Sequence, residues 1–174
     1  MNQKTIISLV IILIGVTSLV LWSKSAEKGD LSASELVANS HPARIGGSLS
    51  ASEIFYDFGK ISMKNGDVSK TFTVANPTNE DMKISNLSSS CMCTNAYILN
   101  SDGNRKGPFG MPGHGGAATR ANEIVKAGES VGIEVVYDPN AHGPAGVGMI
   151  DRFVYLEDEN GNKLQFEIKA NVTP

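Results

Sequence analysis

The sequence predicts an all-β protein, an antiparallel β-sandwich of about seven strands that is preceded by one N-terminal transmembrane helix. Three observations lead to this fold class. A long uncharged stretch lies within residues 1–23. After residue 50, short runs alternate between apolar and polar side chains and are separated by turn residues, which is typical of half-buried strands. Glycine supplies 18 of the 174 residues, above the average of about 7%, and this abundance indicates many turns rather than long helices.

The overall composition is that of an ordinary globular protein. Hydrophobic residues make up 41% of the chain and charged residues 19%, which argues against intrinsic disorder. The net charge of −3 leaves no basic surface field to hold a phosphate backbone, so no nucleic-acid partner is expected. Two cysteines cannot hold a fold of this size together, and the core must therefore be hydrophobic.

The first element, residues 1–23, is predicted to be a membrane anchor. No residue from Thr5 to Ser23 carries a charge. As a helix that rises about 1.5 Å per residue, this stretch would reach about 28 Å, close to the hydrocarbon thickness of a bilayer. Trp22 suits the headgroup level at its end. The residues that follow form a poor cleavage site, so an uncleaved signal-anchor that contacts the membrane through residues 5–23 is favoured over a cleaved signal peptide.

Residues 24–50 are predicted to be a flexible linker, because Ser, Ala and Gly predominate in them. The charges on the two sides of the anchor are nearly balanced, with Lys4 before it and Lys24 and Lys28 after it. A very short head followed by a large C-terminal domain still favours export of that domain. We therefore expect a single-pass protein of the cell membrane whose C-terminal domain is extracytoplasmic, where disulfides persist.

Residues 51–174 are predicted to form the β-sandwich. Asn160-Gly161 is the strongest short signal for a hairpin. One apolar face per run is the pattern of two antiparallel sheets that pack face to face. The alternating runs cover residues 54–58, 68–74, 82–85, 93–99, 131–137, 150–156 and 164–172.

One long connection interrupts this rhythm. Residues 100–123 show no clear periodicity and are rich in glycine and proline. Loops longer than about 12–15 residues are uncommon in compact domains and are usually functional or disordered. We expect such a loop here, directly after the run that carries both cysteines.

The segment Cys91-Met92-Cys93 is the strongest candidate for chemistry. In an extended segment, residues i and i+2 point to the same side, so both sulfurs could address one partner. A disulfide between them would close a very small ring near the upper limit of the Cα separation for bridging, and it would be strained and readily reduced. Thiolates beside methionine and histidine would instead suit Cu(I), with Zn(II) as a second choice of metal.

Three further side chains could complete such a metal site, namely Met111, His114 and His142 from the loops that follow. A plain alternative is that the cysteines only fill the core and that the histidines are polar loop groups. The sequence leaves three interpretations open: ordinary core residues, a soft-metal site, or a redox-active pair.

Motifs of common enzyme classes are absent. The sequence contains no GxSxG, no HExxH, no phosphate-binding lysine loop and no GxGxxG before a helix. No catalytic residue is therefore assigned, and we expect the protein not to be an enzyme, with thiol-redox activity as the one exception to test.

Five segments form an ordered set of motifs: Tyr56–Ile61, Phe72–Asn76, Ser90–Thr94, Ala127–Glu129 and Val135–Pro139. They look like a "DFG-x-I" opening, a "F-x-V-x-N" strand, a "S-C-x-C-T" segment, a glycine-glutamate turn and a "V-x-Y/F-D" strand. Together these motifs resemble the bacterial family called domain of unknown function 1573. The resemblance extends over nearly the whole part of the chain that follows the linker.

The resemblance implies a fold and a setting. The family is similar to Hydin-type immunoglobulin-like modules, which implies an immunoglobulin-like β-sandwich outside the cytoplasm or at the bacterial surface, and no established activity. Met92 stands where the family usually has glycine. This departure favours a soft-metal site, and it removes the backbone freedom that would ease a tight disulfide.

These observations predict a membrane-anchored, extracytoplasmic immunoglobulin-like module that binds a protein or another envelope partner, or has a structural role, without catalysis. The alternative is an envelope protein that binds copper or zinc, or is thiol-redox active, through Cys91-Met92-Cys93.

Overall fold

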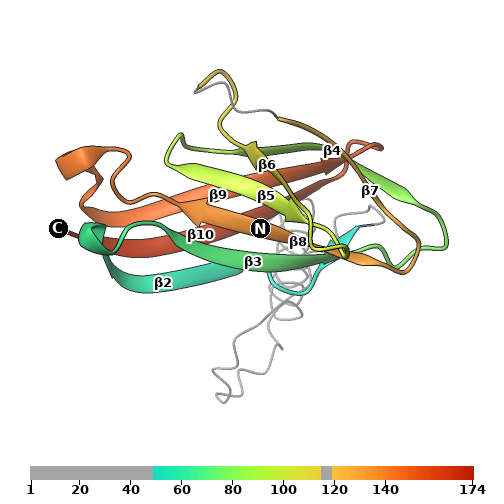
Figure 1. Cartoon of the computed structure of the whole chain (residues 1–174), viewed down its shortest axis with the longest axis horizontal. Helices are drawn as coiled ribbons and strands as arrows, with labels where there is room; N and C mark the ends of the chain where they lie inside the picture. Colours follow the sequence, from blue (N-terminus) through green and yellow to red (C-terminus); the bar gives the residue numbers. More distant parts are fainter. Residues whose placement is uncertain (1–48, 115–118) are drawn as a thin grey trace, which may run out of the picture. The chain divides into compact units, whose positions relative to one another are not determined.

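The computed structural model describes residues 49–114 and 119–174 (Figure 1). The predicted anchor at residues 1–23 lies outside the described residues, as does the predicted linker apart from Leu49 and Ser50. Within the two described ranges, no helix has both the length and the apolar character needed to cross a membrane.

The described residues form ten strands and two short 3-10 helices. Their bounds are β1 Ser50–Ala51, β2 Phe55–Ser62, η1 Met63–Asn65, β3 Val68–Ala75, β4 Met82–Ser89, β5 Thr94–Leu99, β6 Arg105–Phe109, β7 Arg120–Val125, β8 Ser130–Tyr137, η2 Gly143–Gly146, β9 Gly148–Asp158 and β10 Lys163–Thr173.

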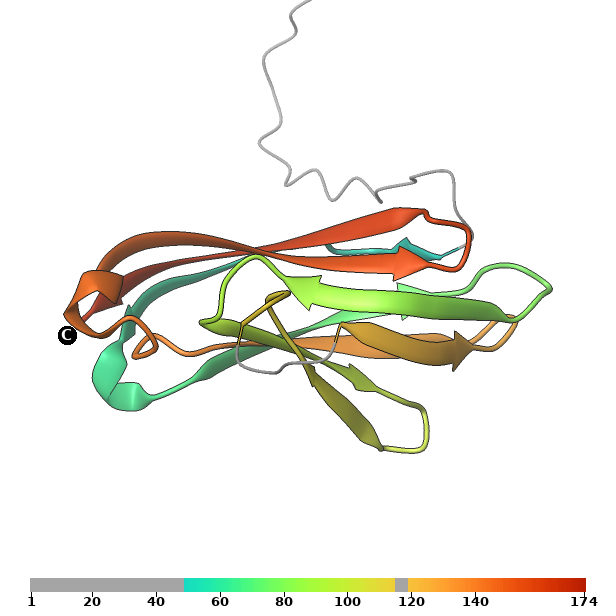
Figure 2. The same ribbon diagram turned by 90° about the horizontal axis from the view of Figure 1, so that it is seen from above.

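The strands form two five-stranded sheets that make a sandwich (Figures 1 and 2). One sheet has the order β1-β3-β8-β5-β6, and the other has the order β2-β10-β9-β4-β7. The predicted all-β sandwich is confirmed. The prediction of purely antiparallel strands is wrong at one place, because β2 and β10 pair in parallel. Apolar alternation reports which face of a strand is buried, and it carries no information on strand direction.

The predicted number of about seven strands is too low. The seven alternating runs correspond to β2, β3, β4, β5, β8, β9 and β10. Of the remaining three strands, β6 and most of β7 fall at residues where the sequence predicts one long loop, so that prediction is wrong. Both are edge strands. β6 buries only Phe109, and β7 buries only Ala121 and Val125, so neither has an alternation that the sequence could reveal.

The hydrophobic core lies between the two sheets. Phe72 of β3 and Phe166 of β10 come from opposite sheets and stack with their ring centroids 4.9 Å apart. The inward side chains of β8 and β10 supply much of the remaining core: Val131, Ile133, Val135, Tyr137, Leu164, Ile168, Ala170 and Val172.

The predicted hairpin at Asn160-Gly161 is confirmed, since β9 and β10 pair antiparallel on either side of it. Gly161 has a φ of 81°, a conformation that glycine adopts without a steric cost. Asp158 is buried, and its Oδ1 accepts hydrogen bonds from the backbone N–H groups of Asn160 at 2.8 Å and Asn162 at 2.9 Å. The carboxylate therefore holds the turn from inside.

Two connections between the sheets leave from the same end of the sandwich. Residues 90–93 cross from β4 to β5, and residues 138–147 cross from β8 back to β9. The end of the first crossover lies beside the start of the second, because Thr94, the first residue of β5, pairs with Tyr137, the last residue of β8. The first crossover carries both cysteines, and the second carries His142.

Candidate functional site

Residues 90–93 form a turn and not the extended segment that the sequence predicts. The backbone N–H of Thr94 donates to the carbonyl oxygen of Cys91 at 3.1 Å, which closes the turn. The Ser89 hydroxyl donates to the same oxygen at 2.8 Å. The Cα atoms of Cys91 and Cys93 are thereby 5.2 Å apart, well within the range of about 4.4–6.8 Å that is usual for disulfides. The sequence predicts an extended segment with a Cα separation near the upper limit for a disulfide, and the turn brings the two Cα atoms closer than that.

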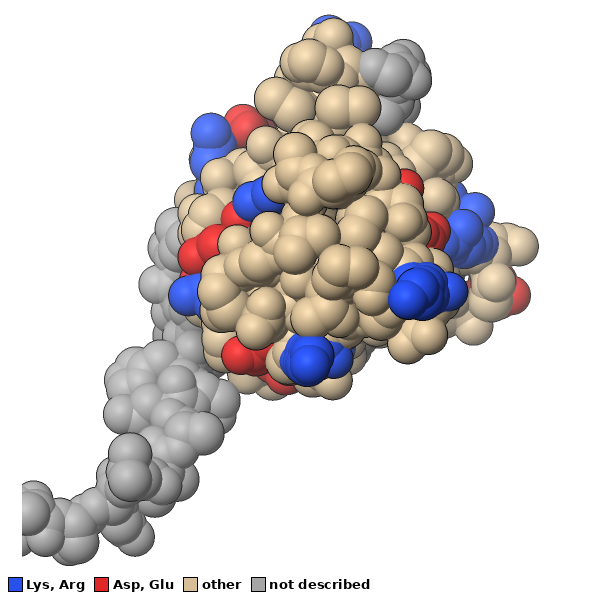
Figure 3. Space-filling model, turned by 90° about the vertical axis from the view of Figure 1, so that its left-hand side faces the viewer, with Lys and Arg blue, Asp and Glu red and all other residues tan. Residues whose placement is uncertain are grey.

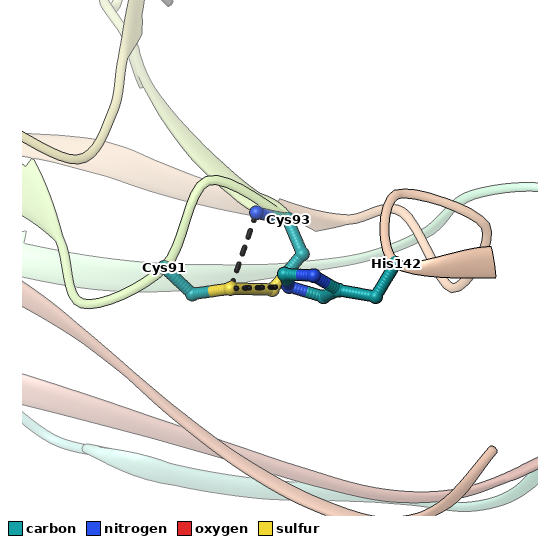
Figure 4. A group of neighbouring side chains, drawn as sticks. All are labelled: Cys91, Cys93 and His142. Atoms are coloured by element: carbon teal, nitrogen blue, oxygen red, sulfur yellow. Dashed lines mark hydrogen bonds between the residues drawn. A yellow bond between two sulfur atoms is a disulfide. The ribbon is translucent and has the colours of Figure 1, made fainter. Parts of the chain in front are cut away.

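Cys91 and Cys93 are joined by a disulfide whose two sulfurs have different surroundings (Figure 4). Cys91 is half-buried, whereas Cys93 is only 1% exposed. The Cys93 backbone N–H donates to Cys91 Sγ at 3.2 Å, and the Thr94 hydroxyl lies 3.6 Å from Cys93 Sγ. A partner from solution can therefore reach Cys91 more easily than Cys93.

His142 lies beside the more accessible sulfur. Its Nε2 is 3.2 Å from Cys91 Sγ, and its ring extends from the β8–β9 crossover toward the disulfide (Figure 4). Asp138 Oδ1 accepts a hydrogen bond from the Asn140 backbone N–H at 2.7 Å, and the Asn140 amide donates to the carbonyl oxygen of Met63 at 2.9 Å. These bonds hold the loop, and they place a group that can accept or donate a proton next to Cys91.

Arg152 contacts the buried sulfur. Its Nε lies 3.3 Å from Cys93 Sγ, and its Nη1 donates to the carbonyl oxygen of Asp151 at 2.8 Å. Arg152 occupies a core-facing position of β9, between the buried side chains of Ile150 and Val154. Arg152 is not among the site residues that the sequence predicts. The sequence feature that could have revealed it is a single arginine on the apolar face of an alternating run.

The charge of Arg152 also acts on Tyr137, a buried residue next to the site. Tyr137 ends β8 and is 1% exposed. Burial raises the pKa of its hydroxyl, the positive charge of Arg152 opposes this rise, and the negative charge of Asp138 adds to it. A positive charge therefore faces both the buried sulfur and the end of the core.

The structure brings together three of the five predicted site residues. Among the His, Cys, Asp and Glu side chains that the structure describes, Cys91, Cys93 and His142 form a group whose donor atoms all lie within 4.8 Å of one another. Met111 and His114 lie in a turn where the His114 N–H donates to the Met111 carbonyl oxygen at 3.2 Å. His114 is exposed and lies outside the group. Figures 1 and 2 show this turn, after β6, apart from η2 and the loop that carries His142.

A family comparison agrees with the resemblance that the sequence motifs indicate. Residues 49–102 match the family model "Protein of unknown function (DUF1573)". The matched range contains β1 to β5 and the cysteine turn, so the resemblance is confirmed there. The motifs at residues 127–129 and 135–139 lie beyond it. No curated protein matches the chain.

One solved structure shares the fold at low sequence identity. A protein of unknown function from Porphyromonas gingivalis W83 has a TM-score of 0.52 and 12% identity, over 72% of this chain and 46% of that one. The chain thus spans less than half of that protein. The secreted serine protease VesC from Vibrio cholerae is less similar, with a TM-score of 0.43 and 14% identity over 73% of this chain and 24% of that one. The apo PmoF2 PCuAC domain has a TM-score of 0.41 and 10% identity over 72% of this chain and 91% of that one. The likeness to the Porphyromonas gingivalis protein concerns the fold alone.

Proposed function

We propose that the protein is a membrane-anchored, extracytoplasmic immunoglobulin-like module whose Cys91–Cys93 pair exchanges between disulfide and dithiol with partner thiols. The sequence favours a binding or structural module and has thiol-redox activity as an alternative. The asymmetry of the two sulfurs supports the alternative. Cys91 is half-buried beside His142, whereas Cys93 is covered and meets Arg152. Exchange needs these two features, an accessible sulfur to attack and a stabilised sulfur to leave.

Reduction of the pair proceeds in two displacements. An incoming thiolate attacks Cys91 Sγ, a new sulfur–sulfur bond forms, and the bond to Cys93 breaks with its electron pair left on Cys93. The resulting Cys93 thiolate accepts hydrogen bonds from Arg152 Nε and the Thr94 hydroxyl. A second partner thiolate then attacks the partner's sulfur in the mixed disulfide and releases Cys91 as a thiolate. The two partner thiols become a disulfide, and the pair becomes a dithiol.

His142 serves the more accessible sulfur in both directions. With Nε2 next to Cys91 Sγ, a protonated imidazole stabilises the departing thiolate and supplies its proton. In the reverse direction, the neutral imidazole accepts the Cys91 proton, and the Cys91 thiolate attacks a partner disulfide. Cys91, Cys93 and His142 thus take part in both the oxidation and the reduction of the pair.

The surface at this end of the sandwich favours a polypeptide partner. Figure 3 views the end, and its middle carries few charged side chains, which lie mainly around the margin. Met92, Val147 and Met149 belong to the two crossovers or follow directly after them, and they are 55%, 44% and 73% exposed. Exposed methionines adapt to partners of varied shape. We therefore expect a cysteine within a polypeptide to react faster than glutathione, which is small and charged.

Trapping of the mixed disulfide tests the exchange. Full-length oxidised protein is mixed with a cysteine-containing peptide, and acid-quenched samples are analysed by intact mass. Cys93→Ser, first activated by a thiol-reactive disulfide reagent, should hold the peptide on Cys91, whereas the wild type should release it as a peptide disulfide. Cys91→Ser is the matched control and should react much more slowly, because Cys93 is buried. Equal reaction of the two variants, or a wild-type pair that stays oxidised in excess dithiothreitol, contradicts the proposal.

The membrane topology needs its own experiment. A reporter enzyme that is active only outside the cytosol is fused after Pro174, and the same fusion is made to a chain that lacks residues 5–23. We expect activity and membrane association for the first fusion, and loss of both for the second. Activity of a cytosol-specific reporter at the same position would contradict the proposed export.

A further inference from the structure

We propose that the reduced cysteine pair binds one Cu(I) ion together with His142, in a three-coordinate site made of Cys91 Sγ, Cys93 Sγ and His142 Nε2. The site rests on the proposed function in one respect, because only the dithiol form can provide two thiolates. It is narrower than the metal site that the sequence predicts, since His114 lies outside this group of His, Cys, Asp and Glu donors and Met111 is not assigned as a ligand.

The donor atoms are already close to the positions that one ion requires. All three lie within 4.8 Å of one another, and the imidazole nitrogen is 3.2 Å from the nearer sulfur. Thiolate and imidazole ligands lie about 2.0–2.3 Å from such an ion, so three ligands around it are about 3.5–4.0 Å apart. Reduction lets the two bonded sulfurs separate to this distance by side-chain rotation, while the Cα separation of 5.2 Å stays as it is.

The number and type of ligands favour Cu(I) over Zn(II). Thiolates are soft ligands that suit both ions. Structural zinc sites almost always have four ligands. Among the described residues, the group of His, Cys, Asp and Glu side chains at this position has three members, so a zinc ion would lack its fourth protein ligand.

The charge balance of the site points the same way. Two thiolates and one Cu(I) carry a net charge of −1. The guanidinium of Arg152, whose Nε lies 3.3 Å from Cys93 Sγ, offsets this charge. With Zn(II) the metal and its two thiolates would already be neutral, and the partly buried arginine would remain as an excess positive charge next to them.

An anaerobic competition titration tests the site. Full-length protein is reduced with a phosphine, its thiols are counted, and Cu(I) is titrated in against a chromophoric chelator. We expect two thiols and one tightly bound Cu(I) per chain. His142→Gln should weaken the binding at least about tenfold, and the Cys91→Ser/Cys93→Ser variant should lose it. His114→Gln is the matched control and should bind as tightly as the wild type. X-ray absorption should show two sulfur ligands and one nitrogen ligand.

The outcomes separate the two proposals. If two thiols appear but the wild type competes for Cu(I) no better than the double serine variant, the metal site is refuted and the exchange proposal stands. If His114→Gln weakens binding as much as His142→Gln, the ligand set is wrong. If no thiols appear on reduction, both proposals fail. His142 is exposed, so its substitution leaves the core intact, and a thermal melt checks this. A zinc complex that excludes Cu(I) refutes the choice of metal.

Discussion

The contact between Arg152 and Cys93 allows a quantitative prediction for Arg152→Met. A full negative charge on Cys93 Sγ at 3.3 Å from Arg152 Nε would be attracted by about 1.3 kcal/mol at the dielectric constant of water and about 5 kcal/mol at an effective value of 20. Hydrogen bonds to charged groups contribute about 1.5–3 kcal/mol net, between these limits. About half of the charge has developed on the leaving sulfur in the transition state, so the substitution should raise the barrier by about 0.7–1.5 kcal/mol.

This increase predicts that Arg152→Met slows reduction of the disulfide by about three- to tenfold, because about 1.4 kcal/mol corresponds to a factor of ten. The assay is the pseudo-first-order rate with excess dithiothreitol at constant pH, measured by acid quench, alkylation and intact mass. Methionine keeps the length and the apolar stem of the side chain, so the core-facing position of β9 stays filled.

Two controls belong to this experiment. Arg152→Lys keeps the positive charge and should react at a rate between those of the wild type and the methionine variant. Arg120→Met removes an exposed arginine from the edge strand β7 and should leave the rate unchanged. If Arg152→Met folds normally and reacts within twofold of the wild type, the guanidinium has no part in stabilising the leaving sulfur.

Three further predictions concern the stability of the sandwich and are measured by urea unfolding. Phe72→Ala removes a fully buried ring that stacks on Phe166 of the opposite sheet, and it should destabilise the fold by about 3–5 kcal/mol. Asp158→Ala removes the buried carboxylate that accepts hydrogen bonds from two partly buried backbone N–H groups at the β9–β10 hairpin, and it should cost about 1–3 kcal/mol. Gly107→Ala places a Cβ 2.8 Å from the Tyr97 ring, at a backbone φ of 142°. A non-glycine residue in such a conformation costs about 1–3 kcal/mol of stability, and the clash with the ring should add to this cost.

Each of these three changes has a control in the same fold. Ile124→Ala truncates a side chain that is 57% exposed, and a loss as large as that of Phe72→Ala would contradict the location of the core. Asp102→Ala removes an exposed turn carboxylate and should have little effect. Gly103→Ala shares the positive φ, at 78°, but its Cβ meets no atom within 4 Å. An equal cost at both glycines would rule out the predicted clash.

The strand predictions succeeded where one face of a strand is buried along its whole length. β8 and β10 alternate regularly between buried core residues and more exposed ones, and this pattern is visible in the sequence. The same reasoning failed for β6, which buries only its last residue, Phe109. It also failed for the turn at residues 90–93, because hydrogen bonds from Ser89 and Thr94 to one carbonyl oxygen, and not hydrophobic pattern, determine its shape.

The candidate site was only partly visible for the same kind of reason. The close spacing of Cys91 and Cys93 singled the pair out without any structure. His142 was one of several candidate ligands, and the sequence had no means to separate it from Met111 and His114. Arg152 was assigned only to a strand. Its position on an apolar face was the sign that a buried partner was present.

The sequence by itself determined which side chains of the seven alternating strands enter the core, where the β9–β10 hairpin turns, and that two cysteines lie close together. These are local properties, because side-chain periodicity and turn chemistry act over a few residues. Only the tertiary structure decided what surrounds the cysteines. The β4–β5 and β8–β9 crossovers leave the two sheets at the same end, so His142, 51 residues from Cys91, and Arg152, 59 residues from Cys93, reach the two sulfurs. The order of the strands in the sheets sets these contacts, and no local pattern encodes that order.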